Sequence, residues 1–110
     1  MKRVILKFKI GGDSWEFNLI SSVTYRRRFG SDSEAICLLR EKEVWFSRND
    51  FGLNVVAHEL VHILFSQSAH GSSDLDSHQT EEIAAEIMGR YVFMLPLWTA
   101  EIYTKLRCKS

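Results

Sequence analysis

Residues 51–69 constrain the fold of this chain most strongly, because they read as one helix with apolar residues on most of its sides. Asn49 and Asp50 precede the segment and are typical helix N-caps. The polar stretch at residues 70–77 ends the pattern. A helix that is apolar nearly all round must be covered on several faces, so we expect it to lie buried in the centre of the fold.

Two segments before this helix alternate apolar and polar residues, as strands do. In residues 4–20 the alternation continues on both sides of a Gly-Gly-Asp turn at residues 11–13, which predicts a β-hairpin. Residues 35–47 predict a second hairpin around a polar turn. Between the hairpins, a serine cap before residues 22–29 and Gly30 after them predict a short helix.

The segment after the central helix is expected to be helical as well. Asp76 or Ser77 caps a helix over residues 78–95, which Pro96 is expected to end. Residues 97–107 then form a terminal helix with an apolar stripe. The expected fold class is α+β, with a small antiparallel-rich sheet of two hairpins packed on these three helices.

Length and composition predict one domain over residues 1–110, since 45% of the residues are hydrophobic and one is proline. Fourteen Lys and Arg balance fourteen Asp and Glu, which argues against a nucleic-acid partner. Apolar runs fall short of the ~20 residues of a membrane helix. Cys37 and Cys108 match no disulfide framework or zinc knuckle, so reduced thiols and a cytoplasmic location are expected. The oligomeric state stays open.

The sharpest motif is His58-Glu59-Leu60-Val61-His62, in the middle of the central helix. Histidines four apart lie about 40° from each other around a helix and roughly 6 Å along it, so both imidazoles can converge on one metal ion. Zinc suits that arrangement, and Glu59 is placed to exchange a proton with a metal-bound water. The structural alternative is two histidines packed in a helix core, which would leave polar groups without partners.

A catalytic zinc needs a third protein ligand. Glu82 in the next helix is the best candidate, and Glu86 follows it by one turn on the same face. Glu82 would bind the metal, while Glu86 would accept a hydrogen bond from the second nitrogen of a ligand histidine. Glu81 is the rival, although its neighbour one turn on is Ala85, and it also reads as a first-turn acid. Other possible ligands lie in or beside the polar loop: His70, Asp74, Asp76 and His78.

His58-Glu59-x-x-His62 followed by Glu82-x-x-x-Glu86 resembles the gluzincin metallopeptidases. The chain length resembles the minigluzincins, their minimal single-domain members, and small phage or prophage proteases share this plan. The resemblance implies zincin-like packing, with His58, His62 and Glu82 as zinc ligands, Glu59 as general base and acid, and Glu86 as the partner of His58. For a phage-encoded member it implies the host cytoplasm.

The resemblance also implies an edge strand at residues 44–47 that pairs with an extended peptide substrate, although the pattern alone shows a strand. Larger gluzincins steady the oxyanion from a further subdomain, for which we expect no counterpart in these residues, so Tyr91 and Tyr103 are the candidates for that role. The terminal helix is a candidate cover for the metal, with Cys108 as a possible further ligand or simply a free thiol.

The leading functional hypothesis is zinc-dependent hydrolysis of peptide bonds in a peptide or protein substrate, an endopeptidase activity with Glu59 as general base and acid. The alternative is a zinc-containing binding or regulatory protein with little or no turnover. A metal-free structural module is the third reading. Substrate specificity and biological role cannot be read from the residues.

Overall fold

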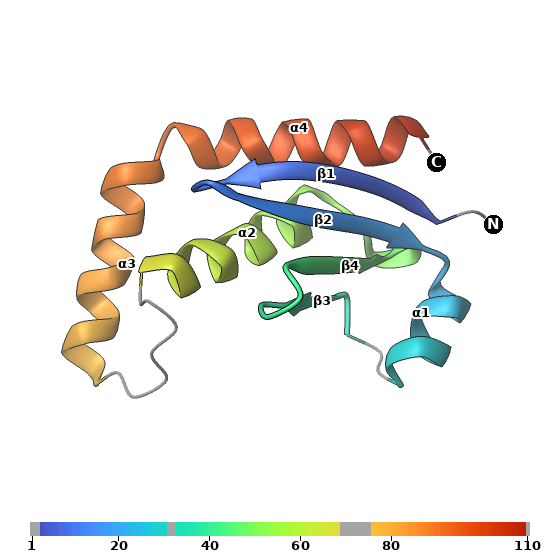
Figure 1. Cartoon of the computed structure of the whole chain (residues 1–110), viewed down its shortest axis with the longest axis horizontal. Coiled ribbons are helices and arrows are strands. Elements are labelled where there is room, and N and C mark those ends of the chain that lie inside the picture. The colour runs from blue at the N-terminus through green and yellow to red at the C-terminus, as the bar shows by residue number, and fades with distance from the viewer. Residues whose placement is uncertain (1–2, 31–32, 69–75, 110) are drawn as a thin grey trace.

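The structure is a computed structural model, and it describes residues 3–30, 33–68 and 76–109. The described part of the chain forms one four-stranded mixed sheet and four α-helices (Figure 1), so the predicted α+β class is confirmed. In chain order the elements are β1 (Val4–Ile10), β2 (Asp13–Ile20), α1 (Ser22–Phe29), β3 (Ala35–Leu38), β4 (Glu43–Ser47), the 3-10 helix η1 (Arg48–Asp50), α2 (Leu53–Ser68), α3 (Ser77–Tyr91) and α4 (Met94–Lys109).

Both predicted hairpins are present, and a parallel pair of strands joins them. β1 pairs antiparallel with β2 across a turn in which Gly11 and Gly12 have φ of +59° and +89°, values that favour glycine. β3 pairs antiparallel with β4, and β4 pairs parallel with β2. The sheet is therefore mixed, because the chain leaves β2 through α1, returns as β3 and re-enters as β4 in the direction of β2.

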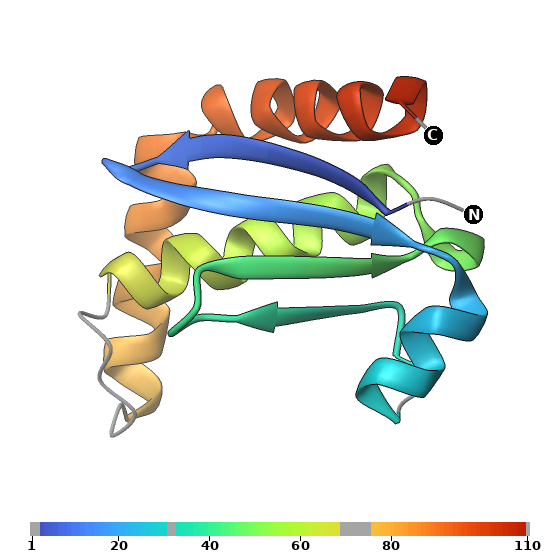
Figure 2. The ribbon, with the colours of Figure 1, turned by 45° about the vertical axis from the view of Figure 1, so that its right-hand side comes forward.

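The strand order β1-β2-β4-β3 places β4 in the interior of the sheet (Figure 2). Val44 and Phe46 pack into the main core with α2, whereas Trp45 packs on the opposite side with Ile20 and Tyr25. Val44, Trp45 and Phe46 are all buried because the strand is covered on both faces. The expectation that residues 44–47 form an edge strand is therefore wrong, and the edges are β1 and β3.

The short helix α1 is capped as predicted. The Ser21 side-chain oxygen accepts a hydrogen bond from the Thr24 backbone N–H at 3.2 Å. At the other end Gly30 has φ of +61°, and its N–H donates to the Arg26 carbonyl at 2.8 Å. α1 covers the Trp45 side of the sheet, where the ring of Phe29 meets the ring of Trp45 at 5.6 Å.

The central helix α2 is buried as predicted, and it carries the main core. Val56, Leu60, Ile63 and Leu64 are fully buried between the sheet and α4. α4 packs against α2 and β1, along the edge of the sheet opposite β3 (Figures 1 and 2). The predicted cap of α2 is wrong, because residues 49–50 belong to η1 and α2 begins at Leu53.

The last two helices meet at a different point from the predicted one. Asp76 caps α3 with a capping box completed by Gln79, as the sequence suggests. α3 ends at Tyr91, however, and α4 begins at Met94, so Pro96 lies in the first turn of α4. Proline is tolerated there because N–H groups of the first turn have no acceptor within the helix.

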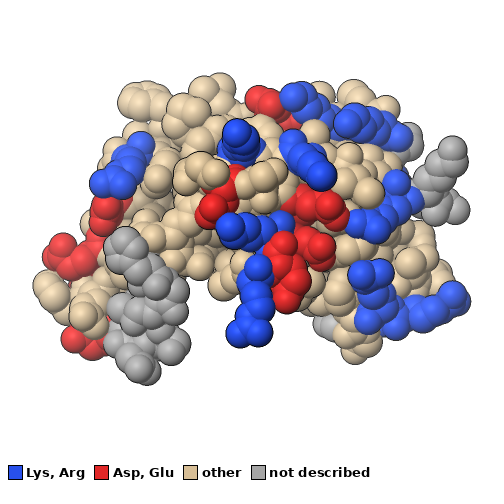
Figure 3. All heavy atoms as spheres, in the orientation of Figure 1, with Lys and Arg blue, Asp and Glu red and all other residues tan. Residues whose placement is uncertain are grey.

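The face of the sheet that looks towards the viewer in Figure 3 carries charges of both signs. Arg3 pairs with Glu16 at 2.7 Å, and Lys42 pairs with Asp13 at 3.0 Å. Within the described ranges, no helix has the length and apolar character that crossing a membrane requires.

Candidate metal centre

His58 and His62 lie side by side on the exposed side of α2, with their Nε2 atoms 3.1 Å apart. Their spacing of one helical turn brings the rings to 4.7 Å between centroids. In a tetrahedral zinc site, bonds of about 2.0–2.1 Å place two ligand nitrogens about 3.3 Å apart. The observed separation therefore fits two ligands of one ion.

Glu59 is the buried member of this group. Its side chain is 6% exposed, and its Oε2 atom lies 3.8 Å from Nε2 of His58. Burial raises the pKa of the Glu59 carboxyl, and the neighbouring charges of His62 and His58 oppose that rise. His58, Glu59 and His62 offer donor atoms within 4.8 Å of one another, and they are the one such group of three found in the described residues.

His58 and Glu59 open onto a pocket between α2 and the start of β3. The pocket has a volume of about 270 Å³ and is lined by Ser33, Glu34, Ala35, Asn54, Val55, His58 and Glu59. Cys37 of β3 lies close enough to Glu59 for that carboxylate to add to the effect of burial, which raises the pKa of the thiol to about 12. The strand beside His58 and Glu59 is thus the edge strand β3.

Sequence reasoning missed the residues that β3 and α1 contribute to this region. Asn54 could have been found, because it lies one helical turn before His58 on the same face of α2. Ser33 and Cys37 carry no local signal, since only the strand order brings them beside α2. Tyr25 is likewise remote in sequence, and its hydroxyl forms a hydrogen bond of 2.9 Å with Ser33.

The predicted third ligand, Glu82, lies outside this group. Its side chain is 70% exposed on α3, and its Oε1 atom lies 3.7 Å from Nε2 of His78. Glu86 pairs with Arg90 at 2.9 Å and lines a separate pocket with Gln67. The structure therefore brings His58, Glu59 and His62 together, but it does not bring Glu82 or Glu86 to them.

The rival ligands are spread along the start of α3. Glu81 is exposed, and Asp76 accepts a hydrogen bond from the Gln79 backbone N–H at 2.7 Å as the helix cap. His78 is the partner of Glu82. His70 and Asp74 lie outside the described residues.

The two tyrosines considered for the oxyanion lie elsewhere. Tyr103 stacks on Phe51 with ring centroids 5.1 Å apart, and Tyr91 meets Trp98 at 5.8 Å. Neither lines the pocket that contains His58. α4 runs along the β1 side of α2 and leaves the histidine pair exposed, so in this arrangement it does not act as a cover. Cys108 is an exposed free thiol near its end.

Comparison of the chain with known protein families, with curated proteins and with solved structures gave no match in any of the three.

Proposed function

We propose that this chain is a zinc-dependent peptidase of the gluzincin type, with a zincin-like arrangement of its sheet and helices. His58, His62 and Glu82 are the proposed zinc ligands, Glu59 the general base and acid, and Glu86 the carboxylate that orients His58. The observation that carries the proposal is the pair of Nε2 atoms 3.1 Å apart beside the buried Glu59 carboxylate.

The chemistry of the donor set suits zinc, because neutral imidazole nitrogens and a carboxylate are ligands it commonly takes. When bound, zinc would acidify a coordinated water and polarise the carbonyl of the substrate. Glu59 then has a role that its position supports: it accepts the proton of the attacking water and delivers it to the leaving amine. A carboxylate whose pKa is raised by burial is a stronger base than one in open solvent.

An extended peptide is the substrate that the surroundings favour. β3 lies at the edge of the sheet and borders the pocket that contains His58 and Glu59. A peptide that adds to this edge would be held by main-chain hydrogen bonds, with its carbonyl groups beside the histidines. We therefore propose β3 as the strand with which the substrate pairs, whereas the sequence suggested residues 44–47.

The role proposed for Glu82 requires α3 to lie closer to the histidines than it does here. α3 contacts α2, and within α3 Ile87 is the residue that is buried. Ile83 and Tyr91 add partly buried contacts with the core. A helix held by one buried and two partly buried apolar side chains can be repositioned at a lower cost in free energy than a fully buried helix. Metal binding is the event that we propose draws Glu82 in.

We further propose that the protein works in the cytoplasm, because Cys37 and Cys108 are both free thiols.

The alternative function is a metal-binding protein without turnover, which acts by holding a partner. The separation of Glu82 from the histidines favours it, because two histidines alone would bind zinc weakly.

The test combines zinc content with cleavage of a mixed peptide library by the wild type and by Glu59→Gln. The peptidase proposal expects about one zinc per chain, cleavage by the wild type, and loss of cleavage in Glu59→Gln with zinc retained. Glu81→Gln is the matched control, since it removes an exposed carboxylate and should change neither quantity. Retained zinc without any cleavage would favour the binding protein, and a full zinc content in the double variant His58→Ala, His62→Ala would exclude both.

A further inference from the structure

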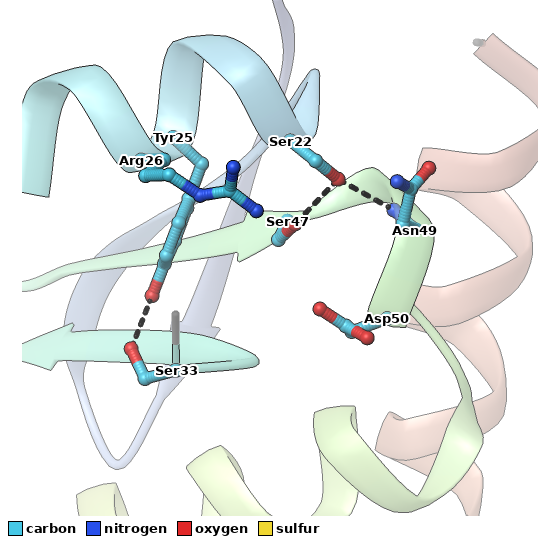
Figure 4. Close-up of a pocket in the computed structure, with 7 residues that line it drawn as sticks. All are labelled: Ser22, Tyr25, Arg26, Ser33, Ser47, Asn49 and Asp50. Atoms are coloured by element: carbon cyan, nitrogen blue, oxygen red, sulfur yellow. Dashed lines mark hydrogen bonds between the residues drawn. The ribbon is translucent and has the colours of Figure 1, made fainter. Parts of the chain in front are cut away.

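A second and larger pocket shares a lining residue with the one beside His58. It has a volume of about 470 Å³ and is lined by Ser22, Tyr25, Arg26, Ser33, Ser47, Asn49 and Asp50 (Figure 4). Ser33, which lies just before β3, lines both pockets. A peptide lying along β3 with its reacting carbonyl at the histidines therefore has a neighbouring residue within reach of this pocket.

The hydroxyl groups of the larger pocket are already bonded to protein atoms. Ser22 and Ser47 share a hydrogen bond of 2.8 Å, and the Asn49 backbone N–H donates to Ser22 at 3.1 Å. The Tyr25 hydroxyl is bonded to Ser33. These contacts fix the walls of the pocket, but they leave few hydroxyl groups to select a ligand.

Asp50 is the charged group in this pocket that lacks a partner. Its carboxylate projects from η1 into the space between α1 and η1 (Figure 4), and no described residue forms an ion pair or hydrogen bond with it. Arg26 lies across the pocket on α1 and has an interaction of its own. The charged side chain of this pocket that remains to attract a ligand is therefore Asp50, which is negatively charged.

The pocket beside His58 contributes a second acidic side chain. Glu34 lines it and is exposed, and no described residue pairs with its carboxylate. Apart from Glu59, the acids Glu34 and Asp50 outnumber Arg26 among the charged side chains that line the two pockets. Such a lining favours a positively charged side chain and disfavours an acidic one. A zinc ion at His58 would add positive charge to the smaller pocket, so selection of a cation falls to Asp50 in the larger one.

We propose that the larger pocket is a specificity subsite for a lysine or arginine near the scissile bond of a peptide substrate, with Asp50 as the residue that recognises the cation. The substrate class would then be basic peptides. The proposal rests on the peptidase function proposed above. A charge-assisted hydrogen bond to the Asp50 carboxylate would supply the selectivity.

The test measures binding and cleavage separately. Fluorescent peptides that differ at one position, as Lys, Gln or Glu, are titrated into zinc-loaded Glu59→Gln protein, and the same peptides are offered to the wild type for cleavage. The Lys peptide should bind about tenfold more tightly than the Gln peptide, as one charge-assisted contact allows. Asp50→Asn should abolish this preference, whereas Glu41→Gln, an equal change of charge in the β3–β4 turn, should preserve it.

The outcomes distinguish the two proposals. Cleavage without a preference for Lys, or a preference that survives Asp50→Asn, would overturn the subsite. A preference for the Glu peptide that Arg26→Gln removes would show that Arg26 is the recognition group and would overturn the role of Asp50. Selective binding of the Lys peptide with no cleavage of any peptide would support the subsite and overturn the peptidase function.

Discussion

The side-chain amide of Gln67 donates a hydrogen bond of 2.9 Å to the backbone carbonyl of Ile10, at the point where β1 enters its turn. This contact joins the last turn of α2 to the β1–β2 hairpin, so it helps to set how the helix that carries the histidines lies on the sheet. Gly11 lies against the same Gln67 side chain, because a Cβ atom at position 11 would stand 2.7 Å from Oε1 of Gln67.

We expect Gly11→Ala to lower the free energy of unfolding by about 2 kcal/mol, through its positive φ and the displacement of Gln67. Gly12→Ala is the matched control, since Gly12 also has a positive φ but has no atom within 4 Å of its Cβ position. Urea denaturation of both variants measures the difference. If Gly11→Ala remains the worse variant by the same margin in a Gln67→Ala background, the contact with Gln67 is not the cause.

The three acids of α3 should differ in their effect on zinc affinity. Glu82→Ala should weaken zinc binding most, because it removes a proposed ligand. Glu86→Ala should lower the zinc affinity by ~10 to 100-fold, as is typical when a residue that hydrogen-bonds to a metal ligand is removed. Glu81→Ala should change little. Titration of zinc against a competing chelator ranks the three variants. Should Glu81→Ala prove the most severe, the ligand would be assigned to the wrong residue.

Glu59 should make the metal-free protein less stable as the pH rises. The pKa of its carboxyl in the folded state is raised above the ordinary value of 4.5, because burial disfavours the charged form. The folded state therefore binds the Glu59 proton more tightly than the unfolded state does. The stability that this proton gives is fully present below the unfolded pKa and is lost as the pH rises through the folded pKa.

Glu59→Gln should consequently be more stable than the wild type at pH 7 in the absence of metal, and the gap should narrow towards pH 4. Chemical denaturation across this range, with chelator present, measures the gap. Glu81→Gln, at an exposed position, should show no such trend. A gap that is constant with pH would mean that the Glu59 carboxyl titrates alike in the folded and unfolded chain.

The two cysteines should differ sharply in reactivity. A pKa of about 12 leaves Cys37 almost entirely as the neutral thiol near pH 8, whereas Cys108 is exposed on α4. Iodoacetamide should therefore modify about one thiol per native chain and both in urea. Cys108→Ser should remove the native reaction, and rapid labelling of that variant would show that Cys37 is not shielded.

The sequence predicted those features that are encoded locally. The spacing of His58 and His62 within one helix is enough to place their nitrogens together, since helix geometry fixes it. The hairpin around Gly11 and Gly12 and the caps of α1 follow equally from neighbouring residues. Glu59 could be identified as part of the candidate site because it is adjacent to His58 in the same helix.

Long-range placement could not be predicted in this way. Alternation predicts that β4 is a strand, but its parallel pairing with β2 depends on how the chain returns through α1 and β3. The three consecutive apolar residues at the middle of β4 were the available sign that both its faces are covered. For Glu82, helical periodicity fixes the face of α3 but not how α3 sits against α2.

The parallel pairing of β2 with β4 also bears on the order in which the molecule can fold. The β1–β2 hairpin closes a short loop, whereas β4 can join β2 only after α1 and β3 have been bridged, at a larger cost in chain entropy. The pocket beside His58 has β3 as a wall, so it should be completed late. Pulsed hydrogen exchange should protect the amides of β1 before those of β3, and the opposite order would contradict this sequence of events. Until β3 has paired, a refolding chain would therefore present its histidines without the wall that faces them.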